Sequence, residues 1–385
     1  MIRFTTSGES HGKALVAIIE GIPAGLKINQ EYINKELSRR QQGYGRGKRM
    51  LIEQDKAEIL SGVRHQRTLG SPITLLIPNK DYKNNQDIMS PFSYTKVVKP
   101  LLKPRPGHAD LPGLIKYGLE DVRDILERAS ARETAARVAV GAVCKTFLKE
   151  FKIDIMSYTL QVGNVISDVS AVQKGEFWKN VETSSLKCPD IKAELQMRRL
   201  IDRVLKKGDT LGGKVVVVAK NVPIGLGSHT QWDLKFDGRL ARSLISIQAV
   251  KSVEFGLGVK LAETLGSAAH DEIFYSKKNG FYRTTNRAGG IEGGLSNGEP
   301  ITITCTMKPL PSLVNSLTSV NLETKKMSKA EVVRSDVCAV ASLGVVCESA
   351  LACEIASAFK EKFGADSLND IKNNFNSYNK RQKAL

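Results

Sequence analysis

Aromatic side chains and paired cysteines are scarce in this sequence. Aromatic residues make up 6% of the 385 positions, which leaves little material for the stacking platforms that bind nucleic-acid bases. The six cysteines form no C-x-x-C pair. Their spacing favours buried thiols in a reducing compartment over a disulfide framework or a zinc site. We therefore predict no metal.

Long uncharged apolar runs are also missing. Arg3, Glu9 and His11 interrupt the N-terminal segment, which argues against a secretory signal. Glu348 and Glu354 interrupt the longest apolar candidate, so no membrane span is expected. These features predict a cytoplasmic protein without a membrane partner.

Acidic residues are fewer than basic ones, with 40 Asp and Glu against 57 Lys and Arg and a net charge of +17. Such an excess implies an anionic partner, which the charge alone leaves open as nucleic acid, a membrane surface or a small polyanionic substrate. No linker or internal repeat divides the chain, so we expect a single domain over residues 1–385. A polar tail at about 366–385 carries apolar residues at helical spacing.

The apolar patterns predict a mixture of strands and helices. Asn29 is expected to cap a helix at its N-terminus, and Ser130 with Glu133 forms an S-x-x-E capping box before a helix that runs to about Phe147. A further buried helix is expected over 335–363. Strands are expected at 2–5, 14–19, 73–77, 215–219 and 301–306.

Two glycine-flanked loops present histidine. Residues 8–12 place Glu9, Ser10 and His11 within one turn between two glycines, and residues 105–110 place His108 in a Pro-Gly loop. An imidazole takes up and releases a proton near neutral pH, so such a pair suits acid–base work or charge stabilisation. Taken singly, each histidine is also compatible with a surface or capping role.

Arginine recurs in the same kind of segment. A Gly- and Arg-rich stretch covers 39–49, and Arg128 and Arg132 flank a capped helix start, where backbone N–H groups favour anions. The guanidinium fork pairs with carboxylate or phosphate at two points. Alone, the first stretch also fits a solvated basic turn, and Asp336 in the Arg-Ser-Asp segment 334–336 also fits a residue at a helix start.

In this order, the segments 8–12, 105–110, 130–134, 225–232, 246–258 and 334–348 resemble the chorismate synthase family nearly from end to end. The resemblance implies an α+β (mixed α/β) single domain, a β-α-β sandwich with long central helices between antiparallel sheets. It also implies a homotetramer.

The resemblance further implies a lyase reaction, the last shared step of aromatic amino acid biosynthesis in the shikimate pathway. Phosphate and a ring proton leave 5-enolpyruvylshikimate 3-phosphate by anti-1,4-elimination to give chorismate. Reduced FMN (FMNH2) is required without net redox change. No appended flavin-reducing domain is visible, so an external flavin reductant is expected, with NADPH as an indirect source.

Site roles follow from the same resemblance. It assigns proton handling to His11 and His108, removal of the ring proton with the flavin N5 to Asp336, and polar support to Ser10 and Ser130. The expected substrate-binding arginines, of which the first two alternatively bind the phosphate of NADP, are Arg40, Arg46, Arg49, Arg105 and Arg132. The expected FMN-binding residues are Arg128, Ala129, Ser130, Gln248, Ala249, Gly293, Lys308, Pro309, Leu310, Pro311, Ser312 and Arg334.

Two other functional classes are alternatives to the lyase. A basic nucleic-acid-binding protein would need clustered aromatic side chains or a recognisable binding module, and neither is visible, so no nucleic-acid partner is expected. A flavin oxidoreductase would consume reductant stoichiometrically with product, and an assay can separate that behaviour from elimination.

Overall fold

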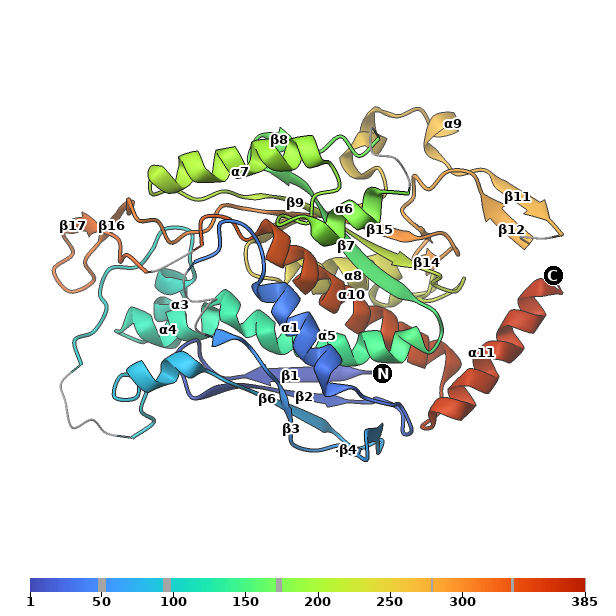
Figure 1. Cartoon of the computed structure of the whole chain (residues 1–385), viewed down its shortest axis with the longest axis horizontal. Coiled ribbons are helices and arrows are strands. Elements are labelled where there is room, and N and C mark those ends of the chain that lie inside the picture. Colours follow the sequence, from blue (N-terminus) through green and yellow to red (C-terminus); the bar gives the residue numbers. More distant parts are fainter. Residues whose placement is uncertain (48–52, 93–97, 171–174, 278–279, 334–335, 385) are drawn as a thin grey trace.

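The described chain is layered, with a helical layer between two sheets (Figure 1). The computed structural model describes residues 1–47, 53–92, 98–170, 175–277, 280–333 and 336–384. Among the described residues, all strand pairings within the two main sheets are antiparallel. The fold is therefore the α+β sandwich that the resemblance implied.

The first sheet has the order β1-β2-β6-β3. On β2, Leu15, Ala17 and Ile19 are buried and alternate with more exposed residues, because successive side chains of a strand point to opposite faces. The buried face packs on helix α5 (Thr134–Lys149). The strands are β1 (Arg3–Ser7), β2 (Ala14–Glu20), β6 (Ile73–Pro78) and β3 (Glu58–Ile59).

The second sheet has the order β10-β15-β9-β7-β8. Its central strand β9 contains an unbroken run of buried residues from Val215 to Ala219. Helix α10 (Val340–Phe363) packs against β7 and β9. The strands are β10 (Val250–Phe255), β15 (Ile301–Met307), β9 (Gly213–Lys220), β7 (Asp154–Val162) and β8 (Val165–Ile166).

Three helices form the centre of the sandwich: α1 (Gln30–Gln41), α5 (Thr134–Lys149) and α10 (Val340–Phe363). At the contact of α5 with α10, a Cβ on Gly141 would lie 2.3 Å from the Ser349 Cβ, so this approach requires glycine. Within the described ranges α10 alone is long and apolar enough to cross a membrane, and 94% of that segment is buried inside the protein. It is a core helix.

A buried charge network joins the central layer to the second sheet. Glu348 of α10 is fully buried and accepts hydrogen bonds from Arg39 of α1, Lys145 of α5 and Ser157 of β7. Glu36 of α1 pairs with the same two cations. The acidic residue that interrupts the apolar run of α10 is thus compensated by charge from two other helices.

The remaining elements surround this centre. Helices α3 and α4 pack on one another through Leu114, Val122, Ile125 and Leu126, which form a second, smaller core. The remaining helices are α3 (Asp110–Tyr117), α4 (Val122–Ala129), α6 (Phe177–Thr183), α7 (Ile191–Lys206), α8 (Phe236–Ile245), α9 (Gly266–Ala269) and α11 (Leu368–Lys383). Short 3-10 helices cover Lys80–Asn84, Ala131–Glu133, Trp232–Leu234 and Gly258–Glu263.

In the described part of the chain, four further pairs of short strands extend from the layers as hairpins. The strands are β4 (Val63–Arg64), β5 (Arg67–Thr68), β11 (Ile273–Ser276), β12 (Gly280–Arg283), β13 (Ile291–Glu292), β14 (Leu295–Ser296), β16 (Thr318–Val320) and β17 (Met327–Lys329). The β11–β12 hairpin and the β16–β17 hairpin lie at opposite ends of the molecule (Figure 1).

Most predicted elements are confirmed within two residues. Asn29 caps α1, and its Oδ1 accepts from the Glu31 N–H at 2.8 Å. The capping box was half wrong: Ser130 caps the 3-10 turn Ala131–Glu133, but Glu133 bonds to other partners instead of reaching back. The six cysteines are all buried free thiols, as predicted.

The predicted start of the last central helix was wrong by five residues. Helix α10 begins at Val340 instead of 335. Cys338 forms a bridge with Leu211, and its backbone N–H donates to the Gly45 carbonyl, so this stretch is held in a non-helical conformation. Ser335 lies outside the described residues.

Candidate active site

The loop of residues 8–12 connects β1 to β2 and is fastened from behind. A Cβ on Gly8 would lie 2.2 Å from the Ala14 carbonyl oxygen, and its φ of +97° favours glycine. Asn79 Nδ2 donates to the carbonyls of Glu9 and Gly12 at 3.0 and 2.8 Å. The loop therefore holds its polar side chains in a defined place.

His11 lies between two carboxylates. Its Nδ1 is 2.7 Å from Glu127 Oε1, and its backbone N–H donates to Glu127 Oε2, also at 2.7 Å. On the other side of the ring, Nε2 is 3.9 Å from Asp81 Oδ2. The His11 side chain is 24% exposed, so solvent or a ligand can reach it.

Ser10 and Ser130 are brought together as a pair. The Ser130 hydroxyl donates to the Ser10 hydroxyl at 3.2 Å, and the Ser10 N–H donates to the Glu127 carbonyl. Ser130 also accepts from the Arg132 N–H at 3.3 Å. Its capping role is thus real, and the same hydroxyl joins the histidine loop to the start of α5.

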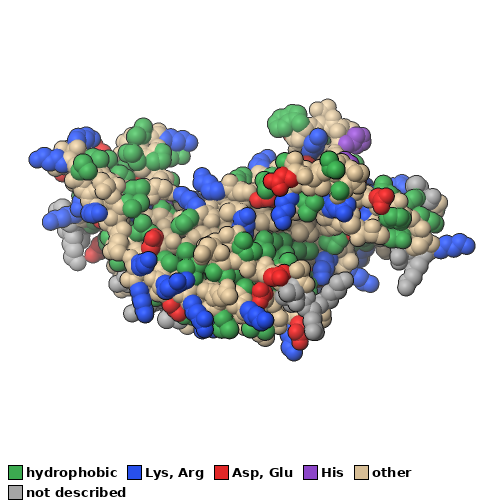
Figure 2. All heavy atoms as spheres, turned by 90° about the horizontal axis from the view of Figure 1, so that it is seen from above, with side chains coloured by type: hydrophobic (Ala, Val, Ile, Leu, Met, Phe, Trp, Pro, Cys, Tyr) green, Lys and Arg blue, Asp and Glu red, His purple; other side chains and the backbone are tan. Residues whose placement is uncertain are grey.

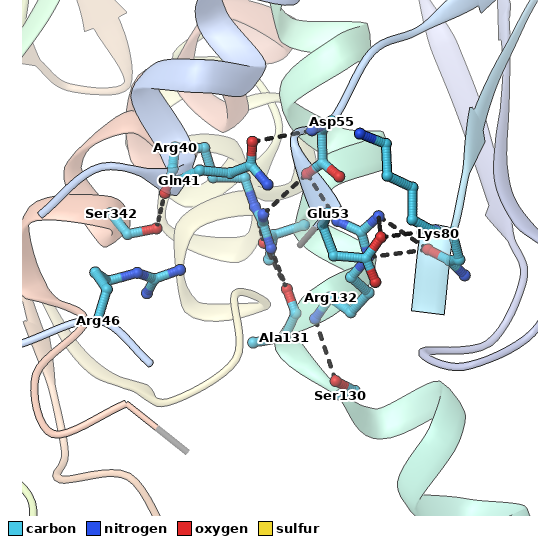
Figure 3. Close-up of polar contacts among 12 residues, drawn as sticks. Arg40, Gln41, Arg46, Glu53, Asp55, Lys80, Ser130, Ala131, Arg132 and Ser342 are labelled. Carbon is cyan, nitrogen blue, oxygen red and sulfur yellow. Dashed lines mark hydrogen bonds and ion pairs between the residues drawn. The ribbon is translucent and has the colours of Figure 1, made fainter. Parts of the chain in front are cut away.

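Arg40 and Arg132 lie on two sides of Asp55 in the interior (Figure 3). Arg132 Nη1 is 2.7 Å from Asp55 Oδ2, and Arg40 Nη1 is 3.5 Å from the same oxygen. Arg40 also donates to the Thr134 hydroxyl and the Ala131 carbonyl. Both guanidinium groups are almost completely buried.

Arg40 is loosely paired within this cluster, 3.5 Å from Asp55. Burial lowers the pKa of Arg40 to about 9; Asp55 opposes the change, while Arg132 and Arg46 add to it. Asp55 Oδ1 and Gln41 Nε2 are buried and lack a hydrogen-bond partner within the described part of the chain. A bound anion would stabilise the charged form of Arg40.

Arg132 is the more firmly held of the two arginines. Its Nε and Nη2 both donate to Asn79 Oδ1 at 3.0 and 2.9 Å, and Glu53 lies 3.6 Å away. Asn79 thus connects the guanidinium to the loop of residues 8–12. An anion binding to Arg132 would have to share it with these partners.

Asp336 is paired with the glycine-rich segment that follows α1. Arg46 Nη1 is 2.6 Å from Asp336 Oδ2, and the Gly47 N–H donates to Asp336 Oδ1 at 2.6 Å. The cap of α10 is Ala339, so Asp336 is not the helix-start residue that its sequence position also allowed. Arg49 and Arg334 lie outside the described residues.

The second histidine belongs to a compact polar group. Asp110 accepts from His108 Nδ1 at 2.5 Å and from Arg105 Nε at 2.9 Å, and it is fully buried. Arg105 Nη1 donates to the Ser312 hydroxyl at 2.8 Å. Burial opposes ionisation of Asp110, but the hydrogen bonds from His108 and Arg105 outweigh it and hold its pKa well below the usual range.

The residues predicted to bind FMN differ in whether their polar atoms have hydrogen-bond partners within the protein. Gln248 Nε2 donates to Glu133, whereas Gln248 Oε1 is buried and has no partner among the residues described. Lys308 bonds to the Ala249 carbonyl through its backbone and to the Gly107 carbonyl through Nζ. Arg128, next to Ala129 at the end of α4, donates to the Gly8 and Thr6 carbonyls.

Further residues predicted to bind FMN follow Lys308 directly in the chain, and one more is Gly293. The Leu310 carbonyl accepts from Thr210, and the Pro311 Cβ would lie 3.6 Å from a Cβ on Gly107. Pro309 lies between Lys308 and Leu310. Gly293 has a φ of +59° and open space where a Cβ would be.

Hydrogen bonds connect these groups into one continuous region. Glu133 bonds Thr6 of β1 and Gln248, the neighbouring Ala249 bonds Lys308, and Lys308 reaches the loop that carries His108. On the face drawn in Figure 2, Lys and Arg side chains are spread widely, with acidic groups scattered among them.

The sequence-based prediction missed the groups that hold these side chains. No sequence motif pointed to Glu127, Asp55, Asn79 or Asp81. Asp110 lies within the segment 105–110, which gave it no role. The first four are isolated in the sequence and carry no local pattern. Asp110 alone had a signal, since it lies two residues from His108 and five from Arg105.

The sequence matches known proteins over nearly its whole length. The family model described as chorismate synthase matches residues 2–359. The chain belongs to the chorismate synthase family. It is 66% identical over 385 residues to a chorismate synthase of Endomicrobium trichonymphae and 52% identical over 390 residues to one of Sulfurihydrogenibium sp. (strain YO3AOP1), with all of each chain covered in both cases.

The fold of the family is shared as well. A crystal structure of a chorismate synthase matches with a TM-score of 0.80 and 42% sequence identity, over 100% of this chain and 99% of that one. Chorismate synthases are carbon–oxygen lyases of the shikimate pathway, and membership places this chain among the lyases.

Proposed function

We propose that the chain catalyses the anti-1,4-elimination of phosphate and a ring proton from 5-enolpyruvylshikimate 3-phosphate to give chorismate. The observation that carries the proposal is the buried arginine cluster around Asp55, in which Arg40 pairs only loosely with that carboxylate, at 3.5 Å, in a chain of this family. The substrate brings two carboxylates and a phosphate. Each charge-assisted contact with them contributes about 1.5–3 kcal/mol.

Substrate anions are bound by the five predicted arginines in this proposal, with unequal contributions. Among the four of these arginines that the structure describes, Arg40 has the longest contact with a carboxylate, 3.5 Å to Asp55, and it is expected to contribute most. Arg132 and Arg105 are tied to Asn79, Asp55 and Asp110 and act mainly by positive potential. Arg46 and Arg49 complete the set. The alternative use of Arg40 and Arg46 for NADP involves the same positive charge.

Proton handling falls to three side chains. His11 and His108 protonate the leaving phosphate or the reduced flavin and hold the anionic charge, because imidazole exchanges protons near neutral pH. Asp336 accepts the ring proton, and its contact with Arg46 at 2.6 Å holds the carboxylate in place. Ser10 and Ser130 support His11 by hydrogen bonding at the base of its loop.

The residues fit FMN as cofactor. The unpartnered Gln248 Oε1 can accept from a heterocyclic N–H. Burial and the neighbouring Lys251 lower the pKa of Lys308, and a phosphate beside it would oppose that shift. Arg128, Ala129, Ser130, Gly293, Pro309 to Ser312 and Arg334 complete the proposed site. When bound, reduced FMN supplies a transient electron without net oxidation.

An anaerobic assay tests the function. The chain is mixed with photoreduced FMN and 5-enolpyruvylshikimate 3-phosphate, and phosphate, chorismate and flavin oxidation are measured. We expect phosphate and chorismate in equal amounts without net flavin oxidation. Flavin oxidation equal to product would instead indicate an oxidoreductase, and no phosphate release would refute the elimination. Omitting NADPH tests whether an external flavin reductant is sufficient.

We further propose that residues 1–385 form one catalytic domain in a cytoplasmic homotetramer. A single core cluster draws buried residues from both sheets and from all three central helices, which supports one domain. Exposed apolar side chains on and near the β11–β12 hairpin, including Leu265, Ile273 and Tyr275 at 79%, 64% and 60%, support self-association. Light scattering of the purified chain tests the tetramer.

A further inference from the structure

Both site histidines have a buried carboxylate on the same ring nitrogen. Glu127 Oε1 lies 2.7 Å from His11 Nδ1, and Asp110 Oδ1 lies 2.5 Å from His108 Nδ1. The two carboxylates are 5% and 0% exposed, and they belong to helices α4 and α3, which pack on one another. An ionised carboxylate only accepts hydrogen bonds. Nδ1 of each ring must therefore carry a hydrogen.

Glu127 holds His11 at two points. One oxygen accepts from the ring and the other from the His11 backbone N–H, each at 2.7 Å. This geometry fixes the orientation of the ring as well as its tautomer. Nε2 lies 3.9 Å from Asp81 Oδ2, beyond hydrogen-bond reach of that carboxylate, and the side chain as a whole is 24% exposed.

Asp110 does the same for His108 while it also holds Arg105. Its Oδ2 accepts from the Arg105 backbone and Nε, and its Oδ1 accepts from Arg105 Nη2 at 3.1 Å. Arg105 Nη2 is 3.0 Å from His108 Nδ1. Since a guanidinium only donates, these two nitrogens share the Asp110 oxygen as acceptor.

We propose that Glu127 and Asp110 are positioning residues that lock His11 and His108 in the Nδ1–H tautomer, so that Nε2 of each ring is the atom that exchanges the proton. In this arrangement an imidazolium releases its Nε2 proton to an oxygen of the leaving group and becomes the neutral Nδ1–H ring. The kinetic consequence rests on the proposed function, whereas the tautomer can be observed in the protein alone.

The test is Glu127→Gln, read first by 15N NMR of the histidine rings in alkaline solution, without flavin or substrate. The His11 signals are assigned by their loss in His11→Gln. We expect a protonated Nδ1 and a bare Nε2 in the wild type. An amide offers one acceptor and one donor; the His11 backbone N–H takes the acceptor, so the ring faces the NH2 group. The tautomer is therefore expected to invert in Glu127→Gln and to stay unchanged in Glu127→Asp.

The second measurement is steady-state kinetics with reduced FMN. Misplacing a proton donor costs on the order of 100-fold in rate, so kcat of Glu127→Gln is expected to fall by about that factor, with KM nearly unchanged. Glu127→Asp should recover most of the loss. Asp124→Asn, which removes an exposed charge from the same helix, should leave kcat unchanged. In Asp110→Asn both kcat and KM should change, because Arg105 is loosened too.

The outcomes separate the two hypotheses. An Nε2–H tautomer of His11 in the wild type, or an unchanged kcat in Glu127→Gln, would overturn the positioning role. A wild-type chain that releases no phosphate would refute the proposed function, and the NMR result would still decide the tautomer. Circular dichroism and unchanged signals from the other histidines confirm that each variant is folded.

Discussion

Arg39 and Arg40 are neighbours in the last turn of α1, but their guanidinium groups enter two different charge networks. Arg39 bonds both oxygens of Glu348 at 2.8 and 2.9 Å. Burial would lower its pKa, but Glu348 and Glu36 outweigh burial and raise it. Arg40 is 3.5 Å from Asp55, and burial lowers its pKa to about 9. The charge of Arg39 is compensated through two short contacts with Glu348, whereas Arg40 has one long contact with Asp55.

The difference separates groups that hold the fold from groups that bind a ligand. In the Arg39 network both oxygens of Glu348 accept hydrogen bonds. In the Arg40 network Asp55 Oδ1 and Gln41 Nε2 have no partner within the described ranges. An unpaired buried polar group costs about 1–3 kcal/mol. Such a cost is expected to persist where a ligand completes the network.

Removal of charge from the compensated network should give the largest effect on stability. Glu348→Gln leaves buried Lys145 and half-buried Arg39 with Glu36 as their shared carboxylate partner. Loss of one partner of a buried pair costs roughly 3–5 kcal/mol, which we expect in the free energy of unfolding measured with urea. Turnover per folded molecule should stay the same. The exposed control Glu182→Gln should change stability by less than about 0.5 kcal/mol.

Acid should expose the same contribution. Burial would raise the pKa of Glu348, but Lys145 and Arg39 outweigh it and lower the pKa from 4.5 to about 2. A lowered carboxyl pKa stabilises the fold fully above pH 4.5, and that stability is lost as the pH falls toward 2. Glu348→Gln should therefore lose less stability than the wild type between these pH values. Parallel urea midpoints would contradict this assignment.

A second carboxylate paired with arginine should behave in the opposite way. Asp336 pairs with Arg46 at 2.6 Å but is 18% exposed, so it contributes less to the fold. If it accepts the ring proton, Asp336→Asn should lower kcat by about 100-fold or more, with FMN and substrate binding largely intact. The exposed Glu323→Gln serves as control. An unchanged kcat would exclude Asp336 as the base.

The neighbouring arginines offer the most direct comparison. Arg40→Met should raise KM for the substrate about 10- to 100-fold, since one charge-assisted contact of about 1.5–3 kcal/mol is lost. Arg39→Met should leave KM unchanged and lower the free energy of unfolding more than Arg40→Met does. Steady-state kinetics and urea titration of both variants measure the contrast. Equal changes in KM would show that the two networks do not differ in function.

Local patterns predicted the elements well because they depend on neighbours in the sequence. Asn29 caps α1 through a residue two positions on, and β2 alternates buried and exposed residues as period two requires. The start of α10 was missed because its cause is distant. The bridge of Cys338 to Leu211 and the bond to Gly45 have no local signature.

The site shows the same division. Its arginines and histidines were found because glycine, proline and charge mark their loops. Their partners Glu127, Asp55 and Asn79 lie 53 to 116 residues from the groups they hold. Only the fold brings these groups together, so their pairing with His11 and Arg132 could not be read from spacing.

A weak anion probe gives the smallest effect and tests charge balance without catalysis. Inorganic phosphate at about ten times its Kd stabilises a protein by roughly 1.4 kcal/mol, which raises Tm by about 2 °C for a chain of this size. We expect this rise in the wild type and in Arg39→Met and its loss in Arg40→Met, measured by differential scanning fluorimetry. Potassium chloride at equal ionic strength controls for screening of the +17 net charge. If Arg40→Met is stabilised as much as the wild type, phosphate binds elsewhere and the Arg40 network is not its site.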